Sequence, residues 1–281
     1  MRILITGAGG MLGNDVTRVA DTAGHEPIAL ARSALDITDR AAVVAAVRSA
    51  APDVVVNCAA WTDVDGAEEG FEDALAINGA GAGHVAAAAG AAGAWTIHVS
   101  SDYVFDGEKS EPYLESDPVA PVSAYGRSKL AGEQEVAAAA PDRHTIVRSS
   151  WLFGVHGRCF PKTILRLAEE REELAVVADQ IGCPTFTGHL AGALVALAEN
   201  PLRGVLHVAG AGACSWFEFA TAIVAAAGSR CRVRPISTEQ YPTPARRPAY
   251  SVLESERGAP QLAEWQQALR EFLSELSGVA A

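Results

Sequence analysis

A phenol and an ammonium group lie four residues apart in Tyr125-Gly-Arg-Ser-Lys129. On a helix this spacing is about one turn, so both groups would project from the same face. Ser100 and Ser101 close a largely apolar run that begins at Trp95. An open α/β sheet holds its ligand at the carboxyl ends of its strands, so we expect Ser101, Tyr125 and Lys129 to converge there.

These three groups suit the reduction of a carbonyl compound. A proton must reach the oxygen as hydride reaches the carbon, and a free phenol with a pKa of about 10 is slow at this task. We expect Lys129 and an oxidised nicotinamide to ease the ionisation of Tyr125, and Ser101 to donate a hydrogen bond to the carbonyl oxygen. Two structural explanations are the alternatives to these roles. Ser101 would be a strand-end serine bonded to the backbone, and Tyr125 and Lys129 would be a solvated pair on the surface.

The first half of the chain alternates between two kinds of segment. Short apolar runs predict strands over residues 3–6, 27–30, 54–57, 95–100 and 144–148. Alanine-rich stretches of helical length lie between them, at residues 39–50, 78–92 and 123–140. This alternation predicts an α/β fold with a Rossmann-type, doubly wound parallel sheet that helices cover on both faces.

Beyond residue 150 the pattern becomes irregular. Gly and Pro interrupt residues 154–161 and 182–184, and Tyr241-Pro-Thr-Pro-Ala-Arg-Arg-Pro248 is a stiff extended segment with two adjacent cations. The last clear element is an amphipathic helix over residues 262–276. We expect a dinucleotide-binding domain over residues 1–150 and a smaller C-terminal, mainly substrate-binding lobe over 151–281, with some segments returning to the first domain.

Composition narrows the range of partners. The 281 residues include 34 acidic and 22 basic ones, and the net charge of -12 favours a small-molecule partner over nucleic acid. The five cysteines form no C-x-x-C pair, so we expect neither a structural zinc site nor a disulfide framework. The apolar stretches are short for a membrane span, and Met1 leads directly into a strand, so we expect a cytoplasmic protein without a membrane partner.

A glycine-rich turn follows the first predicted strand. In Gly7-Ala-Gly-Gly10-Met-Leu-Gly13 the glycines permit a tight turn, and they let a pyrophosphate approach the amides at the start of a helix. A bare turn would be the alternative. The position between an N-terminal strand and a helix favours dinucleotide binding.

The end of the second predicted strand bears on the choice of coenzyme. An acid normally holds the adenosine ribose at this point, but the sequence reads Ala29-Leu-Ala-Arg32-Ser33, and Ala31 cannot accept a hydrogen bond. Arg32 could meet a 2′-phosphate, or it could be simply solvated. We expect NADPH to be used at least as well as NADH. Asp36 and Ile37 would flank the adenine, unless Asp36 caps the next helix.

Together these motifs resemble the extended short-chain dehydrogenase/reductases, and more specifically the dTDP-4-dehydrorhamnose reductases. The resemblance covers most of the chain. The supporting segments are Val56-Asn-Cys-Ala-Ala-Trp-Thr-Asp-Val-Asp65, Ser101-Asp-Tyr-Val-Phe-Asp-Gly107, Tyr125-Gly-Arg-Ser-Lys-Leu-Ala-Gly-Glu133, Arg148-Ser-Ser-Trp151 and Tyr241-Pro-Thr-Pro-Ala-Arg-Arg-Pro248. The last of them lies outside the coenzyme domain and resembles this one family.

The resemblance implies that the C4 ketone of dTDP-4-dehydro-β-L-rhamnose is reduced to dTDP-β-L-rhamnose, with Tyr125 as proton donor and Lys129 on the nicotinamide ribose. Coenzyme contacts would fall on Gly7, Gly10, Met11, Leu12, Gly13, Arg32, Asp36, Ile37, Ala60, Trp61, Thr62, Val99, Tyr125 and Lys129. Substrate contacts would fall on Ser101, Asp102, Tyr103, Trp151, Arg246 and Arg247. The two arginines would meet the diphosphate, or would pin their loop to an acidic surface. The partner would be a dTDP-sugar, and the protein a monomer or homodimer.

Two positions depart from the family pattern. The active-site hydroxyl is often Thr and is Ser101 here, which keeps the donor, and Ala31 replaces the ribose-binding acid. Some family members are described with a magnesium-bridged dimer held by glutamates. The corresponding segment Pro184-Thr-Phe-Thr-Gly-His189 has no acid, so we expect no metal.

Three other functions stay open. A nucleotide-sugar dehydratase or epimerase shares the Tyr–Lys pair, but dehydratases carry an Asp–Glu pair where this chain has Asp102-Tyr103. A reductase of another dTDP-4-keto-6-deoxyhexose would use the same groups. A non-catalytic NADP-binding regulatory subunit would not need Ser101, Tyr125 and Lys129, all of which are present.

Overall fold

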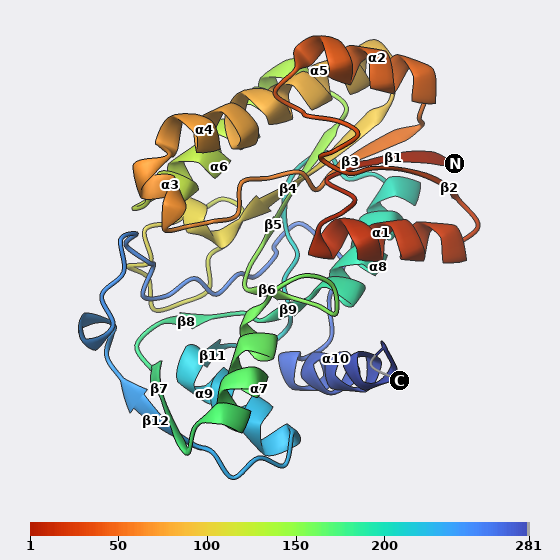
Figure 1. Cartoon of the computed structure of the whole chain (residues 1–281). Coiled ribbons are helices and arrows are strands. Elements are labelled where there is room, and N and C mark those ends of the chain that lie inside the picture. Colours follow the sequence, from red (N-terminus) through yellow and green to blue (C-terminus); the bar gives the residue numbers. More distant parts are fainter. Residues whose placement is uncertain (280–281) are drawn as a thin grey trace.

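A six-stranded parallel sheet forms the centre of the computed structural model, which describes residues 1–279 (Figure 1). The last two residues of the predicted substrate-binding lobe lie outside the described residues. The strand order is β10-β5-β4-β3-β1-β2. The strands are β1 (Arg2–Thr6), β2 (Glu26–Leu30), β3 (Val54–Asn57), β4 (Trp95–Ser101), β5 (His144–Ser149) and β10 (Gly204–His207). The chain runs outward from β1 to β2 and then crosses to β3, so the switch point of this doubly wound sheet lies between β1 and β3.

Helices cover both faces of the sheet (Figure 1). They are α1 (Met11–Thr22) and α8 (Thr187–Glu199) on one face, and α2 (Arg40–Ala50), α5 (Ala82–Ala91) and α6 (Ala124–Ala139) on the other. The alternation of side chains along β1 explains the two layers. Ile3 and Ile5 are buried in a core with residues of α1 and α8, whereas Leu4 is buried with residues of α2 and α5. The predicted class of fold is confirmed.

The helix predicted over residues 78–92 begins earlier and is irregular. It starts as α4 (Phe71–Leu75), passes through a π-helical turn at Ala76–Gly81 and continues as α5. The side chain of Asn78 in this turn accepts from the Trp61 amide at 2.8 Å and donates to the Ser128 hydroxyl at 2.9 Å. In the sequence, the glycines of this segment resemble a helix boundary. In the structure, the π-helical turn directs the buried side-chain amide of Asn78 toward Trp61 and Ser128.

The second lobe is built from three two-stranded sheets and three helices (Figure 1). The strand pairs are β6 (Leu152–Phe153) with β9 (Thr185–Phe186), β7 (Glu173–Val177) with β12 (Arg232–Ile236), and β8 (Ile181–Gly182) with β11 (Cys214–Ser215). The helices are α7 (Phe160–Glu170), α9 (Trp216–Ala226) and α10 (Trp265–Val279). Phe153, Phe186, Phe219 and Phe272 lie in its core. The division between the two domains at residue 150 stays a prediction. Helix α8 and strand β10 come after residue 150 in the sequence, yet they belong to the layers of the central parallel sheet.

The last helix begins three residues later than the predicted range of 262–276. Ala211 donates its amide to Ala263 and accepts from the amide of Trp265, which ties residues 263–265 into an isolated β-bridge. Backbone groups that pair across the chain cannot also close a helical turn, so α10 starts only at Trp265.

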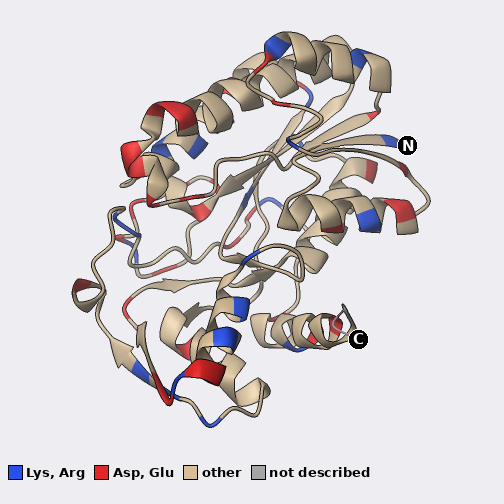
Figure 2. Ribbon diagram, in the orientation of Figure 1, with Lys and Arg blue, Asp and Glu red and all other residues tan. Residues whose placement is uncertain are grey.

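The surface charge is unevenly distributed. Acidic residues recur on α3 (Gly66–Glu69) and α4, whereas basic residues are scattered over the ribbon (Figure 2). Such a surface repels polyanions. Within residues 1–279, no helix has the length and apolar character that crossing a membrane requires.

Candidate active site

The glycine-rich turn lies at the carboxyl end of β1, at the switch point of the sheet. Gly7 has a φ of +66°, and a Cβ there would lie 2.6–2.7 Å from backbone atoms of Cys58 and Ala59. A Cβ on Gly13 would overlap the carbonyl oxygen of Gly7. Gly10 caps α1 without a side chain, so the first amides of this 12-residue helix stay open to an anion. The turn therefore fits a pyrophosphate.

The end of β2 lies beside this turn. Ala8 donates its amide to the carbonyl oxygen of Leu30 at 3.2 Å, which brings Ala31 to the position of the usual ribose-binding acid. Arg32 follows and is exposed. The structure thus leaves Arg32 free to turn toward a phosphate on the ribose.

Asp36 does not cap the next helix, so that alternative is wrong. Its carboxylate accepts from the amide and the hydroxyl of Thr38 at 2.9 and 2.8 Å, and these bonds lower its pKa. Asp39 is the N-cap of α2 and accepts from two amides of the first turn. Asp36 fits a cap by residue type, but its carboxylate is used in the local turn with Thr38. The Ile37 side chain is buried in the core, so any coenzyme contact there would come from its backbone.

The segment Ala60, Trp61 and Thr62 leaves the sheet directly after β3. Asn78 binds both backbone groups of Trp61, with the Trp61 carbonyl accepting at 3.1 Å. The indole nitrogen of Trp61 donates to the carbonyl oxygen of Asp63 at 2.7 Å. Since Asn78 also binds Ser128 on α6, this one amide fixes the segment relative to the helix that carries Tyr125 and Lys129.

The structure brings Ser101, Tyr125 and Lys129 together at the carboxyl end of β4. Ser101 is the last residue of this strand, and its hydroxyl lies beside the Tyr125 phenol. Lys129 is buried, and its ammonium donates to the carbonyl oxygen of Val99 at 2.7 Å. The Ser101 hydroxyl donates to Asp102 at 2.9 Å.

Burial controls the ionisation of this cluster. It raises the pKa of Tyr125 to about 12, helped by the charge of Asp102, while the Ser101 hydroxyl acts in the opposite direction. Burial also lowers the pKa of Lys129 to about 8, and the charge of Glu133 opposes this shift. The Tyr125 shift comes from burial, Asp102 and Ser101, so the expected easing of its ionisation by Lys129 and an oxidised nicotinamide stays a prediction. Because its pKa is about 12, the phenol keeps its proton at neutral pH.

Asp102 and Tyr103 directly follow Ser101 and lie at the same end of β4. Asp102 is buried, which raises its pKa to about 6, and its Oδ2 has no hydrogen-bond partner among the described residues. A buried carboxylate oxygen of this kind is an acceptor for a ligand hydroxyl. The ring of Tyr103 packs edge-on against Tyr125, with centroids 5.4 Å apart.

Trp151 is held in an unusual conformation. Its φ is +48°, and its indole stacks on that of Trp216 with centroids 3.5 Å apart and an interplanar angle of 5°. A Cβ on Gly182 would lie 2.5, 2.7 and 2.8 Å from Cε2, Nε1 and Cζ2 of this indole, so the ring packs closely against the backbone at Gly182. Trp151 is thus held in place by Trp216 and by the backbone at Gly182. Sequence reasoning missed Trp216, for which the capping box of Ser215 and Glu218 was the available signal.

Arg247 pins its segment to the coenzyme domain. Its two terminal nitrogens bind the two carboxylate oxygens of Asp65 at 3.1 and 2.8 Å, and the amide of Ala245 donates to the same carboxylate at 3.1 Å. Arg246 is exposed. The interpretation that this arginine holds its loop to an acidic surface is thus confirmed for Arg247. Its planar guanidinium forms two parallel hydrogen bonds with the carboxylate of Asp65. Asp65 was not among the predicted site residues.

In the described part of the chain, no group of three or more His, Cys, Asp or Glu side chains is arranged to hold a metal ion.

The sheet order, the glycine-rich turn at the switch point and the buried Ser, Tyr and Lys groups define a protein of the extended short-chain dehydrogenase/reductase type. The family model described as "RmlD substrate binding domain" matches residues 1–277, and the chain belongs to this family.

Relatives of known type cover nearly the whole chain. The dTDP-4-dehydrorhamnose reductase of Mycolicibacterium smegmatis is 45% identical over 285 residues, which span 99% of this chain and 86% of that protein. The dTDP-4-keto-6-deoxy-D-glucose reductase of Streptomyces niveus is 42% identical over 273 residues, 95% of each chain. The crystal structure of dTDP-4-dehydrorhamnose reductase from Bacillus anthracis in complex with NADP superposes with a TM-score of 0.94 at 40% identity, covering 98% of this chain and 99% of that one.

Proposed function

We propose that this protein reduces the C4 ketone of dTDP-4-dehydro-β-L-rhamnose to dTDP-β-L-rhamnose with NADPH. The observation that carries the proposal is the meeting of Ser101, Tyr125 and Lys129 at the carboxyl end of β4, beside a turn that fits a dinucleotide pyrophosphate. The names of relatives that cover nearly the whole chain support the choice of sugar.

NADPH supplies the hydride when it is bound. The amides at the start of α1 would hold its pyrophosphate, and the Lys129 ammonium its nicotinamide ribose. The remaining coenzyme contacts would come from Gly7, Gly10, Met11, Leu12, Gly13, Arg32, Asp36, Ile37, Ala60, Trp61, Thr62, Val99 and Tyr125. The complex of the Bacillus anthracis relative with NADP supports this coenzyme.

Tyr125 would give its proton to the ketone oxygen. Its pKa of about 12 keeps the phenol protonated until the oxygen gains negative charge. The Ser101 hydroxyl would turn from Asp102 to the same oxygen and orient it. The free Oδ2 of Asp102 would accept from a sugar hydroxyl, and Trp151 would border the sugar.

Net consumption of coenzyme is the first expected result. With a dTDP-4-keto-6-deoxyhexose, the protein should oxidise one NADPH for each sugar reduced, because a reductase does not regenerate its coenzyme. Absorbance at the reduced nicotinamide band measures this against product formed. A dehydratase or epimerase would turn over without net loss of NADPH, and a regulatory subunit would bind NADPH without turnover.

Arg32 is expected to set the coenzyme preference. Wild-type protein should use NADPH at least as well as NADH, and Arg32→Ser should lower kcat/KM for NADPH by about tenfold while leaving that for NADH nearly unchanged, since only NADPH carries the 2′-phosphate. Arg230, another exposed arginine, provides the control Arg230→Ser. Equal losses with both coenzymes, or a wild-type preference for NADH, would remove the assignment.

A second substrate has support of its own. The Streptomyces niveus relative is named for dTDP-4-keto-6-deoxy-D-glucose, at 42% identity. The same groups would reduce either sugar, since both present a C4 ketone. The monomeric or homodimeric state and the cytoplasmic location stay predictions.

A further inference from the structure

A buried ion pair lies directly behind the proposed active site. Glu133 on α6 accepts from Nε and Nη2 of Arg148 on β5 at 2.8 and 2.7 Å, and from the hydroxyl of Ser100 on β4 at 2.6 Å. Both members of the pair are 5% exposed. Three donors thus hold one carboxylate in place across three elements.

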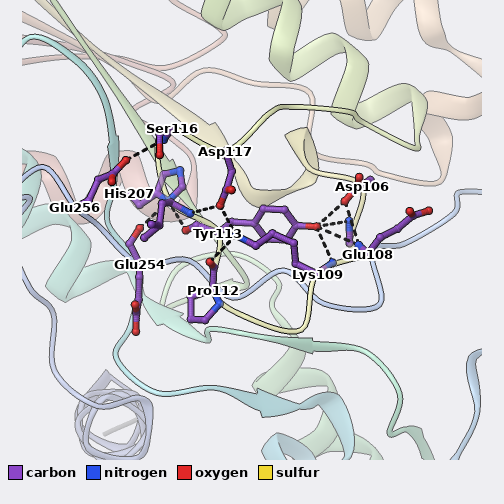
Figure 3. Close-up of polar contacts among 12 residues, drawn as sticks. Asp106, Glu108, Lys109, Pro112, Tyr113, Ser116, Asp117, His207, Glu254 and Glu256 are labelled. Atoms are coloured by element: carbon purple, nitrogen blue, oxygen red, sulfur yellow. Dashed lines mark hydrogen bonds and ion pairs between the residues drawn. The ribbon is translucent and has the colours of Figure 1, made fainter.

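The far side of Arg148 is equally fixed. Its guanidinium lies over the ring of Phe105 at 5.1 Å, and Nη1 is 3.4 Å from Nε2 of His207. Nδ1 of His207 lies 3.0 and 2.9 Å from the carbonyl oxygens of Tyr113 and Glu254 (Figure 3). Two carbonyl neighbours require a proton on Nδ1, so Nε2 is the acceptor that faces Arg148. The guanidinium therefore has a single orientation.

The position of Glu133 relates this pair to the reaction. Glu133 follows Lys129 by four residues on α6, so both side chains lie on one face of the helix. Its second partner, Ser100, directly precedes Ser101. A buried ion pair adds little to stability compared with apolar packing, so stability alone gives no reason for a charge here.

The other groups that face Lys129 are uncharged. On its own helix, Tyr125 has a pKa of about 12. After β3, burial raises the pKa of the Cys58 thiol to about 12. On β4, burial and the charge of Lys129 lower the pKa of His98 well below its ordinary value, and the Val99 carbonyl accepts from the ammonium. Asp102 acts on Tyr125 across the site. Among these described neighbours, Glu133 supplies the negative charge that offsets the burial of Lys129.

We propose that Glu133 is a positioning residue of the reaction. Through its charge it stabilises the buried Lys129 ammonium, and through Ser100 it holds the end of β4 that carries Ser101. The inference rests on the function proposed above, and Arg148 serves it by fixing the carboxylate.

Direct titration of Lys129 tests the proposal. The chain has three lysines, Lys109, Lys129 and Lys162, so labelling with ¹³Cε-lysine gives three NMR signals, and Lys129→Arg identifies one of them. In Glu133→Gln the Lys129 signal should titrate about one pH unit lower than in the wild type. Glu135→Gln, at an exposed position two residues along α6, should leave it unchanged. An unshifted Lys129 signal in Glu133→Gln would overturn the proposal.

Two further variants guard against misfolding, because Glu133→Gln leaves Arg148 buried and unpaired. Glu133→Gln/Arg148→Gln replaces the ion pair by two amides and should give a smaller downward shift, because the lost Arg148 cation acts in the opposite direction. Glu133→Asp keeps both charges, but its shorter side chain moves the carboxylate away from its partners. The Lys129 signal should then titrate at a slightly lower pH than in the wild type. If Glu133→Gln or either of these two variants retains the wild-type circular dichroism spectrum and shows no shift in the titration of the Lys129 signal, the proposal is contradicted.

The pH profile of NADPH turnover gives a separate result. Lys129 loses its positive charge as the pH rises, so kcat/KM for NADPH should fall above about pH 8 in the wild type. In Glu133→Gln this fall should begin at lower pH, whereas a purely structural change would lower kcat/KM equally at all pH values. If the wild type consumes no NADPH, the proposed function fails, while the NMR titration still decides the effect of Glu133 on Lys129.

Discussion

Tyr125→Phe should lower kcat about a thousandfold, because the variant lacks the only phenolic proton beside the Ser101 hydroxyl among the described residues. The aromatic ring remains, and with it the packing against Tyr103. The affinity for NADPH should therefore change little. Stopped-flow measurement of NADPH oxidation gives kcat, and fluorescence titration gives the dissociation constant.

Tyr241→Phe is the matched control for this variant. Tyr241 is 61% exposed, so the loss of its hydroxyl should leave kcat unchanged. If Tyr125→Phe retained wild-type turnover, another group would have to deliver the proton. If the wild type had no turnover to lose, the interpretation as a non-catalytic subunit would stand instead.

Gly13→Ala should weaken NADPH binding more than about a hundredfold. Alanine favours a helix over glycine by about 1 kcal/mol, so local propensity alone predicts a gain in stability. The new Cβ would overlap the Gly7 carbonyl oxygen and lie 2.7 Å from the Cα of Ala8, both of them backbone atoms. The start of α1 must then move away from the turn, which misplaces the amides that would hold the pyrophosphate. We expect a destabilisation of about 1–3 kcal/mol, measured by denaturant unfolding.

Gly192→Ala on α8 separates this effect from helix propensity. A Cβ at Gly192 would meet no atom within 4 Å, so this variant should bind NADPH normally and gain up to about 1 kcal/mol of stability. Normal NADPH affinity in Gly13→Ala would exclude the turn as the pyrophosphate site.

The parts of the fold that depend on local pattern could be predicted from the sequence. Strand β3 was predicted at its observed bounds, because three consecutive β-branched valines precede Asn57 and all four residues are buried. The spacing of Tyr125 and Lys129 likewise depends only on helix geometry, and the structure places Tyr125 beside Ser101 and the Lys129 ammonium at the carbonyl oxygen of Val99 on the same strand.

What the sequence left open depends on contacts between distant residues. The pairing of Asp65 with Arg247 joins positions 182 apart, and no local pattern selects that partner. Glu133 and Arg148 were both visible in quoted motifs, but only the packing of α6 against β4 and β5 shows that they form a buried pair. Asp36 was a plausible cap by residue type, but its carboxylate binds Thr38 instead, and Asp39 caps α2.

The most direct test of the central claim is identification of the product sugar. The protein is supplied with NADPH and dTDP-4-keto-6-deoxyglucose, with and without a 3,5-epimerase, and the product is identified by NMR. The proposed function predicts dTDP-β-L-rhamnose, formed only when the epimerase is present. Reduction of the dTDP-4-keto-6-deoxyglucose without the epimerase, or no reduction in either mixture, would contradict it.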